Sequence, residues 1–188
     1  LANTGARNPL YLQVALEELR GFGSFEQLES RLHRFAEASD VTGLFGQVLE
    51  RLELDFRAPL VEALTCLLAA SRAGLSEMEL ASLTAQQDDR GELQVILRQL
   101  RPWLLRRGRQ VDYYHRTLQT AVEQRYWATD AGLGWRLSLA DWFEARPLDD
   151  RQVEELPWQL DRAGQGKRLA QLLAQPDKIG RASCRERV

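Results

Sequence analysis

The chain has 188 residues, of which 44% are hydrophobic and 28% are charged, and its formal net charge at pH 7 is −2. This length supports one large or two small domains with real cores, and the composition is that of an ordinary globular protein. The small negative charge argues against a protein that coats nucleic acid, and the apolar runs are too short to span a bilayer.

Helical periodicity dominates the first part of the chain. A helix is predicted over residues 9–20, with Pro9 in its first turn, where a missing N–H costs nothing, and with Gly21 as its stop. A capping box at residues 24–27 opens a second helix. Apolar spacing predicts two more helices, over residues 42–54 and 59–73, and the latter is apolar around much of its surface and is expected to lie centrally.

The middle of the chain changes character. A second capping box at residues 75–79 opens a short helix to about residue 83, and another helix is predicted over residues 92–100. Two β-prone runs, at residues 103–107 and 111–114, flank a turn that contains Gly108 and indicate a hairpin. Helix, short helix, helix and hairpin in this order predict a winged-helix domain.

Helices return after the hairpin, over residues 117–127 and 133–145, and the second of these carries aromatic residues with the spacing of a packed core. A helix pair around a turn follows between residues 150 and 173, and it is similar in kind to one unit of a helical repeat. The sequence therefore predicts a mainly α fold: a helical bundle plus a winged-helix domain with one small β-hairpin, followed by α-α repeat-like helices.

The two ends of the chain suggest a piece of a longer protein. Residues 179–188 have no hydrophobic period and, when back-translated, read as a common short-read sequencing adapter, so we interpret them as a non-native tail. The chain opens on Leu1 in a polar stretch, and a single repeat unit needs neighbours to bury its faces. We expect the native protein to extend beyond this fragment.

Motifs for catalysis are absent from the sequence. No GxxxxGKS/T loop for phosphate occurs, nor any cluster of His, Cys and Asp with metal-ligand spacing. Cys66 and Cys184 are the only cysteines and form neither a disulfide framework nor a metal motif, and Cys66 lies in an apolar run that predicts a buried thiol. We predict no catalytic residue and no metal site in this chain, and a reducing, cytoplasmic environment.

The chain has two histidines, and only one of them suggests a site. His33 lies within a predicted helix among charged residues, and we interpret it as structural. His115 falls where the hairpin ends and a helix begins, so backbone N–H groups near it favour an anion. Local sequence alone allows two interpretations, a histidine packed at a helix start or a contact to a phosphate oxygen. Pro9 likewise allows two interpretations, a residue that only starts a helix or a residue that contacts a ligand.

Two segments resemble STAND-class P-loop ATPases of the NACHT and NB-ARC type. Residues 5–20, GARNPLYLQVALEELR, resemble the segment that closes the nucleotide-binding domain of these proteins. In that family a G-x-P motif places its proline against the adenine of ADP or ATP, and Pro9 matches it, while Arg7 stands in place of the glycine. Residues 113–119 are similar to the aromatic-x-His pattern that ends the family's winged helix, where the histidine contacts the β-phosphate of ADP. His115 matches that histidine.

The resemblance implies a domain order and a function. It assigns residues 1–23 to the end of a nucleotide-binding domain, 24–56 to a helical domain, 57–127 to the winged helix and 128–177 to the start of a repeat region. It implies that the intact parent is an ATPase that binds ADP or ATP with Mg²⁺, and that this chain is its regulatory fragment, a nucleotide-gated switch. Its partners would be the rest of its own chain and, on activation, further copies of itself, with no membrane.

Two other functions remain open from the residues. A winged-helix module that binds nucleic acid is the first, because five arginines gather on the predicted third helix of that domain and on its wing: Arg98, Arg101, Arg106, Arg107 and Arg109. Asp88, Asp89 and Glu92 at the start of that helix disfavour base contacts, so nucleic acid is not the partner we expect. The second is a helical scaffold that joins domains.

Overall fold

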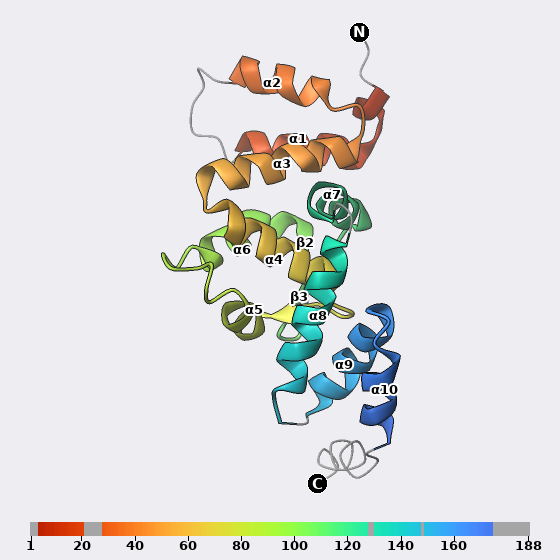
Figure 1. Ribbon diagram of the computed structural model, residues 1–188. Helices are drawn as coiled ribbons and strands as arrows, with labels where there is room; N and C mark the ends of the chain where they lie inside the picture. Colours follow the sequence, from red (N-terminus) through yellow and green to blue (C-terminus); the bar gives the residue numbers. More distant parts are fainter. Residues whose placement is uncertain (1–3, 21–27, 128–129, 148, 175–188) are drawn as a thin grey trace.

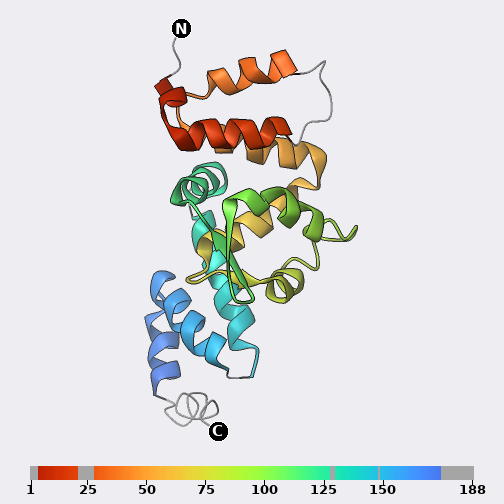
Figure 2. The same ribbon diagram turned by 180° about the vertical axis from the view of Figure 1, so that it is seen from behind.

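The computed structural model describes residues 4–20, 28–127, 130–147 and 149–174 (Figure 1). Over these residues the chain forms ten α-helices and one small antiparallel sheet, which confirms the predicted mainly α class. None of the helices in these ranges combines the length and apolar character that crossing a bilayer requires. The bundle of α1–α3 lies at one end and the helices α9 and α10 at the other, with the winged-helix elements between them (Figures 1 and 2).

The elements follow one another with short connections. Their bounds are η1 Thr4–Arg7, α1 Pro9–Arg20, α2 Leu28–Glu37, α3 Val41–Asp55, α4 Ala58–Ala70, β1 Leu75–Ser76, α5 Glu77–Leu83, α6 Leu93–Leu100, η3 Arg101–Trp103, β2 Leu104–Arg107, β3 Gln110–Tyr113, α7 Arg116–Tyr126, α8 Ala131–Glu144, α9 Asp150–Arg162 and α10 Gly166–Leu173. Most predicted helices are confirmed within one or two residues at each end. Gly21 and the predicted capping box at residues 24–27 lie outside the described residues.

The N-terminal bundle is held by α3. Asp40 caps this helix, since its Oδ1 accepts a hydrogen bond from the Gly43 N–H at 2.7 Å. Arg51 on α3 reaches α1 through a pair of hydrogen bonds to the Glu18 carboxylate, at 2.7 and 3.1 Å, with both side chains largely buried. The Tyr11 hydroxyl of α1 is also buried, and it donates to the backbone at the C-terminal end of α2. These contacts join the three helices into one bundle.

The winged helix is built on α4. This helix buries ten of its thirteen residues, as its apolar sequence predicts, and it ends at Ala70 rather than at residue 73 because the chain becomes extended at Ser71. The capping box that opens α5 is confirmed, with the Ser76 side chain accepting from the Glu79 N–H and the Glu79 carboxylate accepting from the Ser76 N–H. The elements α4, β1, α5, α6, β2 and β3 follow in the winged-helix order.

The sheet has one strand more than the predicted hairpin. Its order is β1-β3-β2, and the two-residue strand β1 pairs with β3 through Leu75 opposite Val111. Gly74, just before β1, has a φ of +81°, and a Cβ there would lie 2.4 Å from the Val111 carbonyl oxygen. A glycine is therefore required for β1 to approach β3 so closely.

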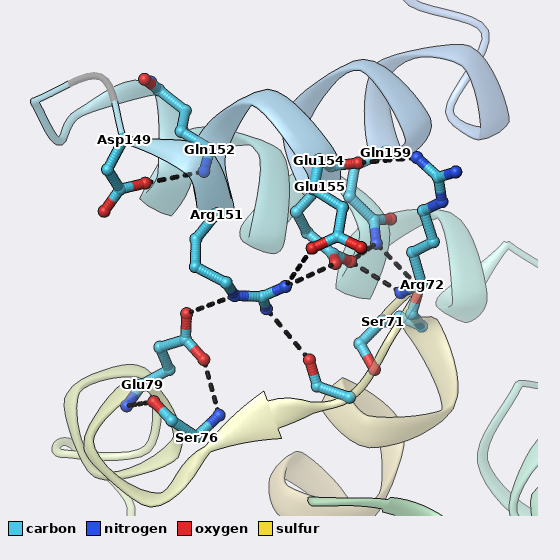
Figure 3. A network of polar contacts seen from close by, with 12 residues as sticks. Ser71, Arg72, Ser76, Glu79, Asp149, Arg151, Gln152, Glu154, Glu155 and Gln159 are labelled. Atoms are coloured by element: carbon cyan, nitrogen blue, oxygen red, sulfur yellow. Dashed lines mark hydrogen bonds and ion pairs between the residues drawn. The ribbon is translucent and has the colours of Figure 1, made fainter. Parts of the chain in front are cut away.

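A polar network fastens α9 to the winged helix (Figure 3). Arg151 of α9 donates to the Glu79 carboxylate at 3.2 Å and to the Gly74 carbonyl oxygen at 3.0 Å. Its guanidinium also lies 3.8 Å from the Glu155 carboxylate, one helical turn along α9. Glu79 is the same side chain that completes the α5 capping box, so one carboxylate serves both the helix start and the junction.

Glu155 is the buried member of this network. Its side chain has no solvent exposure, and its Oε1 accepts from the Arg72 N–H at 2.7 Å and from the Gln159 amide at 2.8 Å (Figure 3). Gln159 also donates to the Ala70 carbonyl oxygen at 2.8 Å. Burial raises the pKa of the Glu155 carboxyl, in spite of these hydrogen bonds and the nearby arginine. The junction is therefore closed by a carboxyl group whose charged form is disfavoured.

Candidate functional site

His115 is held in place by the strand before it and the helix after it. Tyr113, the last residue of β3, is buried and donates its hydroxyl hydrogen to the Thr65 carbonyl oxygen of α4 at 2.7 Å. Leu118, in the first turn of α7, is fully buried. Since both neighbours are anchored in the core, the chain between them has a fixed path. The predicted position of His115, at the junction of the hairpin with a helix, is confirmed.

The His115 side chain is available to a ligand. His115 is the N-cap residue of α7, but its side chain makes no capping hydrogen bond, and the residue is only partly buried. The imidazole meets the exposed Tyr114 ring edge-on, with 4.5 Å between ring centroids and 85° between ring planes. Arg116, the first residue of α7, is exposed beside it. An imidazole, a guanidinium and the free N–H groups of a helix start all attract an anion.

Pro9 is the first residue of α1, which confirms the predicted helix start. The Asn8 side chain caps this helix, because its Oδ1 accepts from the Leu10 N–H at 2.9 Å. Arg7, which stands where the resembling family has a glycine, ends the short helix η1, and Arg7 and Pro9 are both exposed. The helix-cap interpretation thus accounts for Pro9 locally and leaves its ring free to contact another molecule.

Pro9 and His115 lie on two helices that share a neighbour. Helix α3 packs against both α1 and α7. Within the described ranges, no hydrogen bond, ion pair or ring contact joins the two residues. The structure therefore places each candidate residue at a helix start, and the two helices, α1 and α7, both pack against α3.

A basic cleft lies on the other side of the winged helix, between α6 and β2. It has a volume of about 410 Å³ and is lined by Gln94, Leu97, Arg98, Arg101, Leu104, Arg106 and Val111. Three of the five arginines singled out in the sequence thus meet in one cleft. The other two, Arg107 and Arg109, line a separate cleft of about 700 Å³ between the wing and α8.

The acidic residues before α6 have structural roles. Asp88 caps the start of this helix, with its carboxylate accepting from the Glu92 N–H at 2.6 Å. Glu92 in turn accepts from the Arg57 N–H at 3.1 Å, and Asp89 forms an ion pair with the Arg57 guanidinium. These carboxylates fix the loop before α6 to the start of α4. The Arg151–Glu155 junction was not anticipated, because only an i, i+4 spacing marks it in the sequence.

Two other potentially reactive side chains, Cys66 and His33, lie outside these clefts. Cys66 is buried in α4, and burial raises the pKa of its thiol to about 12. His33 is exposed on α2. In the portion of the chain that the structure describes, no three His, Cys, Asp or Glu side chains are grouped so that they could hold a metal ion.

Comparison with known proteins gives one informative similarity. The chain is 28% identical over 159 residues, 81% of its length, to a TPR repeat-containing protein of Dictyostelium discoideum. The chain spans only about 10% of the length of that relative. No protein-family model matches the chain, and no solved structure matches it. The similarity and the helical structure together support a helical, repeat-like character for this chain.

Proposed function

We propose that this chain is the regulatory part of a STAND-class signalling ATPase, acting as a nucleotide-gated conformational switch. In this proposal ADP holds a closed state and ATP permits the chain to oligomerise. The order of the described elements agrees with it: a helix with Pro9 at its start, a helical bundle, a winged helix whose hairpin ends just before His115, and a helix pair. A relative that carries TPR repeats agrees with a protein that continues into helical repeats.

The observation that carries the proposal is the position of His115 and the absence of a capping hydrogen bond from its side chain. It stands at the start of α7, it is anchored on both sides, and its imidazole makes no capping hydrogen bond to its own helix. A structural N-cap residue would use its side chain to satisfy the first N–H groups of the helix. Here the imidazole is not used in this way, so it is left for an anion at the start of α7, which is what a contact to the β-phosphate of ADP requires.

The chain's own residues would contribute binding and not catalysis. Pro9 would lie against adenine, and His115 would donate a hydrogen bond to the β-phosphate. The nucleotide, with Mg²⁺ and the P-loop of the parent, supplies the chemistry of hydrolysis. A switch of this kind works only if the winged helix contacts one nucleotide state better than the other, because a ligand with equal affinity for both states shifts nothing.

The test is ADP retention by the intact parent protein. We expect His115→Ala to weaken ADP binding by about ten- to a hundredfold, since a hydrogen bond to a charged group contributes about 1.5–3 kcal/mol. We also expect it to raise the fraction of oligomer without a trigger. His33→Ala is the matched control, because His33 is exposed on α2, and it should change neither quantity. If His115→Ala leaves ADP retention and oligomerisation as they were, the switch assignment is wrong.

A helical scaffold that joins domains is the second candidate, favoured by the similarity to a TPR repeat-containing protein. It predicts that neither histidine variant has an effect. The winged-helix nucleic-acid module has the arginines around α6 in its favour and the acidic start of α6 against it. Salt-dependent gel-shift binding of duplex DNA by the chain would support that module, and no binding at low salt would eliminate it.

A further inference from the structure

Strand β2 is an edge of the sheet, and half of its backbone groups point outward. The sheet order is β1-β3-β2, and the Trp103 carbonyl oxygen, just before β2, accepts from the Tyr114 N–H at 2.9 Å. Hydrogen-bonded pairs alternate along antiparallel strands, so Leu104 and Arg106 are the positions whose N–H and C=O groups face away from β3. The Leu104 N–H donates to the Arg101 carbonyl oxygen of η3, so the groups open to an added strand are the Leu104 C=O and the Arg106 N–H and C=O. Groups of this kind at a sheet edge can pair with an added strand.

The side chains of the same two residues open into the basic cleft. Leu104 and Arg106 alternate with Leu105, so they lie on one face of β2, and both line the cleft of about 410 Å³ whose opposite wall is α6. Leu97 and Val111 form an apolar, buried floor. The cleft therefore combines free backbone groups, an apolar floor and a charged rim along a single strand edge.

The rim carries positive charge that is not neutralised within the fold. Arg98 and Arg101 are exposed on α6 and η3, and neither forms an ion pair with a described residue. Arg106 pairs with Glu77 on α5. Two guanidinium groups without carboxylate partners at the mouth of a cleft favour a ligand that brings its own carboxylates.

We propose that this edge binds an extended acidic segment of a partner protein, which adds as a strand beside β2. Its backbone would pair with the Leu104 C=O and with the N–H and C=O of Arg106. An apolar side chain would cover the floor, and its flanking carboxylates would meet Arg98 and Arg101. β2 has four residues, so the paired part of the segment is correspondingly short. Backbone pairing supplies binding energy and the arginines supply selectivity for acidic sequences.

An acidic peptide fits this surface better than nucleic acid does. Nucleic acid would use the start of α6 in a groove, and that start carries Asp88 and Glu92, whose carboxylates repel phosphates. Phosphate contacts also need neither an apolar floor nor outward-facing backbone groups. Both of these features, in contrast, are what a bound strand uses.

Binding can be tested with a defined probe and the full 188-residue chain. The probe is a fluorescein-labelled heptapeptide, Ser-Glu-Thr-Val-Thr-Glu-Ser, whose central valine and two flanking glutamates share one face of an extended strand, and its anisotropy is titrated at low salt. The double reversal Arg98→Glu with Arg101→Glu should weaken binding at least tenfold. Arg90→Glu with Lys167→Glu is the matched control, since both residues are exposed and lie outside the cleft and the net charge changes equally. This control should bind within twofold of the unchanged chain.

Strand addition has a separate signature in amide hydrogen exchange. Saturation with the peptide should slow exchange at the Arg106 N–H by tenfold or more, while the Leu104 N–H, which already donates to the Arg101 carbonyl oxygen, should change little. A peptide with proline in place of the central valine should neither bind nor protect Arg106. No binding of this peptide, or binding without protection of Arg106, overturns the proposal. So does a duplex DNA that displaces the peptide and loses affinity in the same double reversal, since the surface would then be a nucleic-acid site.

Discussion

Removal of the Arg151 guanidinium tests the junction between α9 and the winged helix. Arg151→Ala deletes the hydrogen bonds to Glu79 and to the Gly74 carbonyl, and leaves Glu155 without its counter-charge. Two unit charges 3.8 Å apart attract by about 4 kcal/mol at an effective dielectric constant of about 20. Relaxation and water entry reduce this figure, so we expect the free energy of unfolding to fall by about 3 kcal/mol near neutral pH.

The pH dependence of this loss follows from Glu155. Burial already raises the pKa of its carboxyl in the folded chain. A carboxyl with a higher pKa in the folded state stabilises the fold at low pH, and this stabilisation is lost as the pH rises through the folded-state pKa. Removing Arg151 raises that pKa further. The deficit of Arg151→Ala should therefore be smaller at about pH 5.5 than at about pH 7.5, by about 1–2 kcal/mol.

The assay is urea unfolding followed by far-UV circular dichroism, with Arg168→Ala as the matched control. Arg168 also contacts two carboxylates, at Asp141 and Glu144, but those partners are well exposed, so its removal should cost only about 0–1 kcal/mol. A deficit for Arg151→Ala no larger than that of Arg168→Ala would refute the reasoning. A deficit that stays the same at both pH values would refute its electrostatic part.

Three further outcomes are expected. Gly74→Ala should lower the free energy of unfolding by more than about 2 kcal/mol in urea, because a Cβ would lie 2.4 Å from a backbone carbonyl oxygen. Gly164→Ala, at a φ of +66° but in open space, should lower it by only about 1–2 kcal/mol. Equal losses would contradict the close approach at Gly74. In a Cys184→Ser background, Cys66 should resist a thiol reagent near pH 8 until urea unfolds the chain, since its pKa is about 12 and it is buried, and rapid labelling of the folded chain would contradict this. Glu155→Gln should gain stability relative to the unchanged chain as the pH rises from about 4.5 toward neutrality, because only the glutamate loses stability there, and parallel pH profiles would argue against a raised pKa.

Features that depend on nearby residues could be predicted from the sequence. The helix expected over residues 42–54 is α3, Val41–Asp55, because its apolar period and its Asp40 cap act within one or two turns. The capping box of α5 and the position of His115 between hairpin and helix are of the same local kind. The winged-helix order could be predicted because these helices and the hairpin follow one another along the chain as they do in a winged helix.

Features that depend on distant residues could not be predicted. β1 has two residues and is a strand only because Val111 and Gln110, some 35 positions later, pair with it. Arg151 contacts Glu79, which lies 72 positions earlier in the chain, and the hydrophobic periodicity of the sequence does not indicate that contact. The basic cleft combines residues of α6 with residues of β2, so the sequence indicated the arginines but not the strand edge beside them.

The C-terminal end of α4 has a consequence for how this chain is made. The Ala70 carbonyl oxygen accepts from Arg136 at 3.1 Å and from Gln159 at 2.8 Å, which lie 66 and 89 positions later in the chain. At synthesis rates of about 5–20 residues per second, the second donor is polymerised roughly 5–20 s after the acceptor. The central helix of the winged-helix fold is thus completed by residues that lie beyond that domain. We therefore expect α8 and α9 to complete the folding of the winged helix on the ribosome, because a nascent chain stopped before α8 lacks both hydrogen bonds to the Ala70 carbonyl oxygen.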